Sequence, residues 1–346
     1  FLIKIENQFH FLVNYINKLN YEKNFEDIII FGSGLTAKIM SLVARNAGLS
    51  FKLITDKDIG KKPSDDTRSL ALSVASKKML NTLGVNIKTE AVTKMIVIEG
   101  GLGGEKIKSK LSFDRELVDE DIAYISEHSV IEKSIDRVLK LNENEFIKEK
   151  VIKIQKEGNL SKIILNNNEC LLSKAIIFTE VLDRDLQNIY NVKYNFFEYG
   201  QTAISATLRH SKGHKGHAFQ FFQKNGPLAL LPMINKRGNN YSSLVWTEKT
   251  DNISSLISSK KDLEDSLNNL CSDYLGKISI SKGPSSFVLK KLSGVNAVSN
   301  GALFVGDALR AMHPMAGQAW NQSLRDIAYI ADAFAESEKL GLDLFQ

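Results

Sequence analysis

Cysteine, proline and long apolar runs are all scarce in this sequence of 346 residues. Its two cysteines, Cys170 and Cys271, lie far apart and form no CxxC pair. A disulfide scaffold and a cysteine-based zinc site are therefore not expected, and a reducing compartment fits best. No stretch of about 18 apolar residues is free of charges, which argues against a membrane-spanning helix.

Charge of one sign is not in large excess either, since 45 Lys and Arg residues against 40 Asp and Glu residues give a net charge of +5. The lysines are spread among other residue types, as in KIKSK (106–110) and IKEKVIKIQK (147–156). This pattern predicts a solvated lysine-rich face, with attraction to anionic lipid or a phosphate-bearing ligand as the alternative. It does not indicate nucleic-acid binding. Hydrophobic residues make up 43% and charged residues 25%, which excludes a disordered or fibrous chain.

The first motif that could carry chemistry is a glycine turn. A short apolar run at 26–31 predicts a strand, and the helical pattern over 35–48 starts directly after the turn GSG. In such a GxGxxA motif Gly32 permits the tight bend, Gly34 lets a pyrophosphate approach the backbone, and Ala37 lets helix and strand pack closely. The glycines predict dinucleotide binding, and a purely structural turn is the alternative.

Asp56 extends this pattern. It follows a second predicted strand at 49–55, which is the position where a carboxylate can bind ribose hydroxyls. Strand, turn, helix, strand and acid therefore occur in the order that a Rossmann-like dinucleotide site requires.

A second motif lies near the end of the chain, after a predicted strand at 302–305. A carboxylate at a strand end can bind ribityl hydroxyls, and a helix N-terminus can face the polarised end of a flavin ring. Read from the residues alone, an ordinary strand–loop–helix connection is an equally good interpretation. The candidate residues are Gly306, Asp307, Pro314, Gly317 and Gln318.

The remaining patterns predict an α/β protein with two domains, one of them interrupted by the other. Helices are expected at 69–84, 127–141 and 252–276, strands with a Gly-rich hairpin at 92–113, and an antiparallel sheet from 201 to 247. The expected units are a lead-in at 1–25, a Rossmann-like nucleotide-binding domain at 26–185 that resumes at 300–346, and an inserted antiparallel β-sheet domain for substrate at 186–299.

Four segments then carry a family resemblance. They are DDTRSLALSVASKKMLNTLGV (65–85), YGQTAISATLRH (199–210), HAFQFFQKNGPLALLPM (217–233) and FVGDALRAMHPMAGQAWNQSLRD (304–326). The last resembles the second FAD motif of the flavin-dependent aromatic hydroxylases with the para-hydroxybenzoate hydroxylase fold. The others are similar to the branch that hydroxylates polyprenylated phenols in ubiquinone biosynthesis. The resemblance runs from about Asp27 to Leu340, with its motifs in order.

This resemblance implies one bound FAD, with NAD(P)H as a transient reductant, O₂ as oxidant and a prenylated phenol as substrate. It assigns the pyrophosphate to the glycine turn, the adenosine ribose to Asp56, and the vicinity of the flavin to Arg68 and the second motif. It further implies a cytoplasmic protein, with peripheral contact with the inner membrane and a ubiquinone-biosynthesis complex as open alternatives. The cofactor-binding residues so implied are Gly32, Gly34, Ala37, Asp56, Arg68, Gly306, Asp307, Pro314, Gly317 and Gln318. The sequence identifies no catalytic base.

The sequence also departs from the family pattern. Val181, Ala319 and Ser323 stand where the family has glycines, and Leu309-Arg310 replaces Ala-His. We expect a methyl group at Ala319 to crowd the flavin and to strain a backbone with positive φ. The alternatives are therefore a catalytically degenerate or truncated member that acts as an assembly partner, and a flavin dehydrogenase or reductase on the same scaffold.

Three histidines close together, His210, His214 and His217, raise the question of a metal site. No carboxylate or cysteine nearby completes a ligand set, and the segment is expected to be a glycine-bearing turn before a strand. We therefore expect no metal. A GxSxG nucleophile elbow is also lacking.

Overall fold

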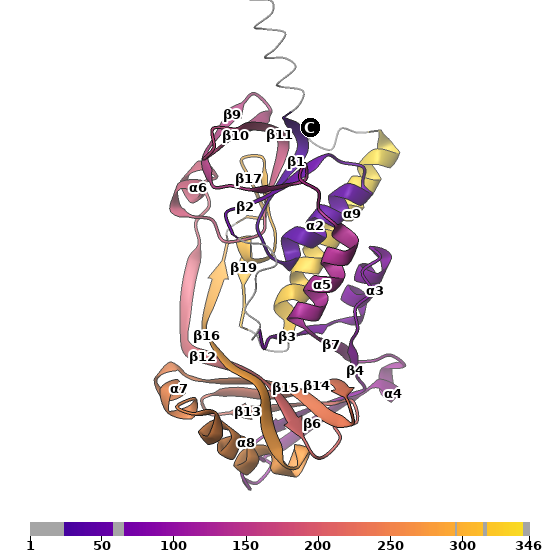
Figure 1. Ribbon diagram of the computed structural model, residues 1–346, viewed down its shortest axis with the longest axis vertical. Helices are drawn as coiled ribbons and strands as arrows, with labels where there is room; N and C mark the ends of the chain where they lie inside the picture. Colours follow the sequence, from indigo (N-terminus) through magenta and orange to yellow (C-terminus); the bar gives the residue numbers. More distant parts are fainter. Residues whose placement is uncertain (1–23, 58–65, 295, 314–316, 342–346) are drawn as a thin grey trace, which may run out of the picture.

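The computed structural model describes residues 24–57, 66–294, 296–313 and 317–341. Two units stand one above the other along the long axis, and two long strands, β12 (Asn195–His210) and β16 (Ile278–Ser293), run between them (Figure 1). The mixed α/β architecture with an inserted antiparallel sheet confirms the predicted fold class. All but the last two residues of the expected lead-in at 1–25 lie outside the described ranges.

The upper unit is built on an eight-stranded sheet with a parallel centre. The order β18–β11–β1–β2–β8 is parallel throughout, and β17, β10 and β9 extend it with antiparallel pairs. The run of three isoleucines in β1 is fully buried because both faces of the sheet are covered. The strands are β1 (Phe25–Phe31), β2 (Phe51–Thr55), β8 (Phe146–Lys148), β9 (Val151–Glu157), β10 (Leu160–Leu165), β11 (Cys170–Phe178), β17 (Val298–Ser299) and β18 (Ala302–Phe304).

Helices cover one face of this sheet, as predicted from the apolar periodicity of their sequences (Figure 1). They are α2 (Leu35–Asn46), α3 (Val74–Thr82), α5 (His128–Leu139) and α9 (Gln318–Leu340); α4 (Arg115–Val118), α6 (Arg184–Ile189) and the 3₁₀ turn η1 (Gly306–Ala308) are short. The expected helix at 69–84 is wrong in its first turn. Residues Ser69–Leu72 form strand β3, and α3 starts only after Ser73, whose side chain caps it by accepting from the amide of Ser76.

The lower unit is a second eight-stranded sheet, in the order β19–β16–β12–β15–β14–β13–β5–β6. Helices α7 (Thr250–Leu256) and α8 (Lys260–Leu275) cover its lower face, where Leu263, Leu267, Cys271 and Leu275 repeat every four residues. Burial raises the pKa of the Cys271 thiol to about 12, so this cysteine behaves as a core residue. The other strands are β5 (Lys94–Glu99), β6 (Ser109–Asp114), β13 (His217–Gln223), β14 (Gly226–Lys236), β15 (Asn239–Lys249) and β19 (Arg310–Ala311).

Residues 94–114 belong to the lower sheet, although the expected boundary places 26–185 in the upper unit. Strand β5 pairs in parallel with β13 along its whole length, and β6 returns beside it as the predicted Gly-rich hairpin. Ile96 and Ile98 of β5 are buried in the core under α8, so the register is fixed by apolar contacts from a distant part of the chain.

A short segment, residues 66–73, joins the two units, and we call it the seam. On one side Thr67 and Ser205 of β12 exchange hydrogen bonds between side chain and backbone, at 3.2 and 3.0 Å. On the other side the carboxamide of Asn321 in α9 donates to the carbonyl of Ala71 at 2.7 Å and accepts from the amide of Ser73 at 2.9 Å. Within the seam, β3 pairs with β7 (Ala123–Glu127), which in turn pairs with β4 (Glu90–Val92) in a small antiparallel sheet.

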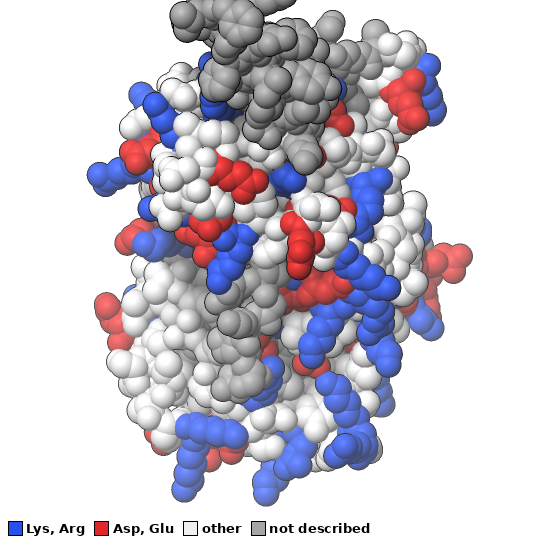
Figure 2. Space-filling view, turned by 45° about the horizontal axis from the view of Figure 1, so that its top comes forward, with Lys and Arg blue, Asp and Glu red and all other residues white. Residues whose placement is uncertain are grey.

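Charges of both signs are interspersed over most of the face in Figure 2, with basic side chains more numerous toward the lower end. Many are paired, for example Lys78 with Glu120, Lys94 with Asp114 and Lys236 with Glu127. The predicted solvated lysine-rich face agrees with this arrangement. Among the described residues, none of the helices combines the length and apolar character that crossing a bilayer requires.

One charge is buried completely. The ammonium of Lys38 in α2 is 0% exposed and lies 3.1 Å from Glu132 and 2.6 Å from Asp136, both on α5. Lys38 therefore ties the helix that follows the glycine turn to its neighbour.

We predict that Lys38→Met lowers the free energy of unfolding by about 3 kcal/mol, because it removes a fully buried cation that lies 3.1 Å from the buried carboxylate of Glu132. The double variant with Glu132→Leu should recover much of this loss. Urea denaturation monitored by circular dichroism measures both. The control, Lys78→Met, breaks an exposed ion pair and should cost much less. A loss for Lys38→Met no larger than that of the control would contradict the prediction.

Candidate cofactor and substrate site

The glycine turn is packed tightly at its first glycine. Gly32 has φ +144°, and a Cβ atom there would lie 2.1 Å from the hydroxyl of Thr179 at the end of β11 and 3.3 Å from the methyl group of Ala37. The amide of Gly32 also donates to the carbonyl of Ile54 in β2 at 3.1 Å. Only glycine fits this position, and the small side chain of Ala37 lets α2 lie directly against the turn.

The second glycine is open instead. Gly34 has φ −85° and ψ −178°, and no described atom lies within 4 Å of the place its Cβ would occupy. It is the N-cap of α2, and in the described part of the chain no side chain caps this end. The first amides of α2 are thus available to an external acceptor, where the helix dipole favours negative charge.

A cleft of about 270 Å³ opens beside the turn, and we call it the glycine-turn cleft. Asp56 lies on its wall together with Gly32, as the motif predicts. Glu180, which the sequence analysis did not single out for this role, accepts from the amide and hydroxyl of Ser33 at 2.6 and 2.7 Å and pairs with Lys57. Burial alone would raise the pKa of Glu180, but the bonds to Lys57 and Ser33 outweigh it and lower that pKa.

The two motifs meet at Gly306. This glycine has φ +62°, and a Cβ there would lie 3.1 Å from Thr36 of α2 and 3.1 Å from Ser323 of α9. Asp307 follows in η1, and its side chain is exposed to solvent and close enough to Glu180 for the two carboxylates to repel each other. Desolvation first, and repulsion by Glu180 second, raise the pKa of Asp307.

The departures from the family pattern have specific places in the structure. Ala319 lies inside the first turn of α9 and has no positive φ, so the expected backbone strain there is wrong. Val181 also adopts no positive φ, although glycine is usual there. Arg310 forms a bidentate ion pair with Asp326, at 2.5 and 2.7 Å, and thereby holds β19 against α9.

Gly317 and Gln318 lie at the start of α9, beside a second cavity. Gly317 has φ +62°, and a Cβ there would lie 2.9 Å from the methyl group of Ala71 in the seam. As at α2, no side chain of the described residues caps this helix N-terminus. Pro314, also assigned to this loop, lies outside the described residues.

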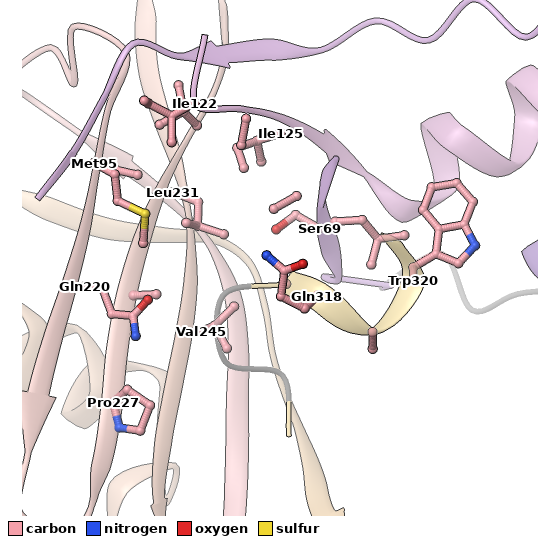
Figure 3. Close-up of a pocket in the computed structure, with 18 of the residues that line it drawn as sticks. Ser69, Met95, Ile122, Ile125, Gln220, Pro227, Leu231, Val245, Gln318 and Trp320 are labelled. Atoms are coloured by element: carbon pink, nitrogen blue, oxygen red, sulfur yellow. The ribbon is translucent and has the colours of Figure 1, made fainter. Parts of the chain in front are cut away.

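This second cavity, the inter-sheet cavity, measures about 270 Å³ and lies between the upper face of the lower sheet and the start of α9 (Figure 3). Its walls are mainly apolar, and the carboxamides of Gln220 and Gln318 reach into it from opposite sides. The lining residues labelled in Figure 3 are Ser69, Met95, Ile122, Ile125, Gln220, Pro227, Leu231, Val245, Gln318 and Trp320.

Arg68 is placed at the seam and is paired with Asp66 through two hydrogen bonds of 2.9 and 2.8 Å. The imidazole of His128 lies 3.4 Å from the same carboxylate. Burial would raise the pKa of Asp66, but its bonds to Arg68 and the charges of Arg68 and His128 lower it to about 2. Arg68 is not one of the described residues that line either cavity.

The clustered histidines have structural roles. His210 uses both ring nitrogens, toward the carbonyl of Lys212 at 2.8 Å and the hydroxyl of Ser242 at 2.9 Å. His214 likewise contacts the carbonyl of Met233 and accepts from the amide of Gly216, each at 3.0 Å. Within the described ranges, no group of three or more His, Cys, Asp or Glu side chains could hold a metal ion.

The described residues fit a flavin dinucleotide. Open space beside Gly34 admits a phosphate at the N-terminus of α2, and Asp56 lines the adjoining cleft. Gly306 lies against Thr36 of α2 and precedes Asp307. The uncapped start of α9 then faces the inter-sheet cavity. Of the ten predicted cofactor residues, Gly32 and Asp56 line the glycine-turn cleft, Gly317 and Gln318 line the inter-sheet cavity, and Pro314 lies outside the described ranges.

Comparison with known proteins agrees with this geometry. A family described as "FAD binding domain" matches residues 191–340. Ubiquinone hydroxylase UbiL of Rhodospirillum rubrum is 25% identical over 326 residues, which cover 92% of this chain and 74% of the relative. The 3-demethoxyubiquinol 3-hydroxylase of Escherichia coli is 22% identical, covering 91% of this chain and 81% of the relative.

Solved structures show the same fold. PqsL of Pseudomonas aeruginosa in complex with 2-aminobenzoylacetate superposes with a TM-score of 0.77 at 12% identity, covering 93% of this chain and 89% of the other. The p-nitrophenol 4-monooxygenase PnpA of Pseudomonas putida gives 0.72 at 14% identity, covering 92% and 82%. The family match and the named relatives support the predicted resemblance to the FAD-dependent hydroxylases and FAD as the cofactor, and the solved structures show the same fold.

We predict that substitutions at the two glycines of the turn affect different properties, protein stability at Gly32 and FAD binding at Gly34. Gly32→Ala should destabilise the protein by roughly 2 kcal/mol or more, because its methyl group meets Thr179 and its φ is unfavourable. Gly34→Val should change stability by less than about 1 kcal/mol but weaken FAD binding at least about tenfold, because its side chain fills the open space above α2. Thermal unfolding and FAD titration measure the two effects. Unchanged FAD affinity in Gly34→Val would contradict the assignment.

The raised pKa of Asp307 predicts a pH-dependent gain in stability for Asp307→Asn. Because the ionised carboxylate is disfavoured in the folded protein, the variant should melt roughly a degree or two higher than the wild type at neutral pH. The difference should vanish below the usual carboxyl pKa of 3.8, where the group is protonated in both states. Asp66→Asn provides the opposite sign: it should lower the melting temperature at neutral pH, and its effect should fade as pH falls through about 2. Equal signs in the two variants would refute the electrostatic interpretation.

Proposed function

We propose that this chain hydroxylates the phenol ring of a polyprenylated precursor in ubiquinone biosynthesis, using FAD, NAD(P)H and O₂. The observation that carries the proposal is the inter-sheet cavity. It joins an apolar sheet face to the start of α9, where Gly317 and Gln318 lie. The relatives named as ubiquinone hydroxylases, which match over most of their own length, support the same substrate class.

When bound, FAD supplies the redox chemistry: it accepts reducing equivalents from NAD(P)H and delivers oxygen from O₂ to the ring. The protein contributes binding, orientation and exclusion of water. In this proposal the amides at the start of α2, beyond Gly34, hold the pyrophosphate. Asp56 accepts hydrogen bonds from the adenosine ribose, and Asp307 accepts them from the ribityl chain.

The start of α9 serves the ring end of the cofactor. Gly317 allows close approach because it has no side chain, and the uncapped amides after it favour negative charge on the reduced ring. Gln318 extends into the same space (Figure 3). In this proposal Arg68, a residue of the seam, lies near the flavin, and its hydrogen bonds to Asp66 hold its side chain in place.

An apolar substrate fits the walls of the inter-sheet cavity, where Met95, Ile125, Leu231 and Val245 would contact a ring and the first units of a prenyl chain. A substrate of this kind resides in the membrane. We therefore propose a cytoplasmic enzyme in peripheral contact with the inner membrane, which receives its substrate there or from partner enzymes of the same biosynthesis.

We predict that the purified chain shows the visible spectrum of bound flavin, at once or after addition of FAD. NAD(P)H oxidation should then consume O₂ at a rate that a short-chain prenylated phenol increases several-fold. Absorbance spectroscopy and an oxygen electrode test this.

The alternatives give different results in the same assay. Substrate-dependent NAD(P)H oxidation without O₂ uptake would identify a dehydrogenase or reductase. A colourless protein that ignores added FAD would identify an assembly partner that has lost the cofactor, and would overturn the proposed hydroxylation.

A further inference from the structure

The wall of the inter-sheet cavity contains a buried side chain, Gln220, whose carboxamide has no hydrogen-bond partner among the described residues. Gln220 in β13 is 6% exposed, and its carboxamide reaches into the cavity (Figure 3). No hydrogen bond joins this carboxamide to any residue of the described ranges. The side chain is thus largely buried while its carboxamide stays open to the cavity, so a ligand in the cavity is the available hydrogen-bond partner.

The register of the sheet explains why the protein itself offers no partner. Directly across from Gln220 lie Val97 on β5 and Ala229 on β14, and Val245 on β15 continues the same row. All three side chains are apolar. Since residues on one strand alternate between the two faces, the neighbours Phe219 and Phe221 point away, into the core under α8.

The other polar groups of the cavity are placed differently. The hydroxyl of Ser69 is already paired with Ser243 at 2.7 Å. Gln318 belongs to the start of α9, on the opposite wall. Thr247 also lies on the sheet wall, but its hydroxyl is on a short side chain next to Pro227. The remaining polar lining residues, His313 and Trp320, lie before α9 and on α9. Among the described residues of the sheet wall, only Gln220 presents a long donor-and-acceptor group from the middle of the apolar face.

We propose that Gln220 is the specificity residue that recognises the ring hydroxyl of the substrate, with its carboxamide oxygen accepting a hydrogen bond from a phenol that carries an apolar substituent. This inference rests on the proposed function, since it names the group that orients the ring in the same cavity. A site built to bind a hydroxyl discriminates strongly against the analogue without it, because the buried amide is then left unpaired.

The test compares 2-geranylphenol with geranylbenzene, two probes that differ only in the hydroxyl group. Binding to the full chain, as purified and after addition of FAD, is followed by quenching of tryptophan fluorescence, since Trp320 lines the cavity. The wild type should bind the phenol about tenfold more tightly. Gln220→Met has nearly the same shape but cannot accept this hydrogen bond, so it should bind both probes equally.

Two control variants accompany it. Gln223→Met makes the same exchange on the same strand, at a position that does not line the cavity, and should keep the tenfold preference. Thr247→Val removes the hydroxyl of Thr247, which also lies on the sheet wall, and should likewise keep the tenfold preference. The proposal is overturned if the wild type shows no preference, if neither probe binds, if Gln220→Met retains the preference, or if Thr247→Val abolishes it.

Failure of the proposed function is recognisable separately. A preference that depends on Gln220 in a chain that never takes up FAD or O₂ would leave the recognition of the hydroxyl intact and refute the hydroxylation. Hydroxylation with a preference that persists in Gln220→Met would refute only the role of Gln220.

Discussion

The seam at residues 66–73 is the element on which the site depends, because it is hydrogen-bonded to both units at once. Thr67 is held by β12 of the lower sheet, and Ala71 and Ser73 are held by Asn321 of α9. These are neutral, largely buried bonds that salt does not screen, so they fix the separation of the units more firmly than surface ion pairs would. The inter-sheet cavity is the space that this separation leaves. Its shape therefore follows from a segment that also lines the cavity, through Ser69, Leu70 and Ala71.

The parts of the structure that could be predicted are those whose cause is local. A strand, a glycine turn, a helix and a terminal acid follow one another within 26–56, and the structure places them as the pattern indicates. The helical stripe of α5 and the hairpin of β5 and β6 were predictable for the same reason. The parts that could not be predicted depend on distant partners: β5 joins the lower sheet because of β13, and Ser69–Leu72 is a strand because of β7.

The same limit on prediction applies to the positions at which the family pattern has glycine and this chain has another residue. A sequence pattern assigns glycine to a position without saying which neighbour requires it. In this chain Gly317 already supplies the left-handed residue from which α9 starts, so Ala319 lies in regular helix and needs no special backbone. Arg310 in place of the family histidine gains Asp326 as a partner on that helix. The substitution at Arg310 thus changes how β19 is anchored to α9.

The charges around the glycine-turn cleft limit which groups could attract a pyrophosphate there. Asp56 and Glu180 line the cleft and Asp307 lies close to Glu180, whereas Lys57 is already paired with Glu180. Lys150 also lines the cleft, but acidic residues outnumber basic ones among its described lining residues. In the proposed binding mode the attraction for an anion comes mainly from the backbone, where the uncapped amides beyond Gly34 offer directed donors and the dipole of a twelve-residue helix. Gly34 matters for that reason: any side chain there would stand between the phosphate and the positive end available to it. In the proposed binding mode, the carboxylates accept hydrogen bonds from the hydroxyls on either side of the pyrophosphate, and the backbone amides bind the pyrophosphate itself.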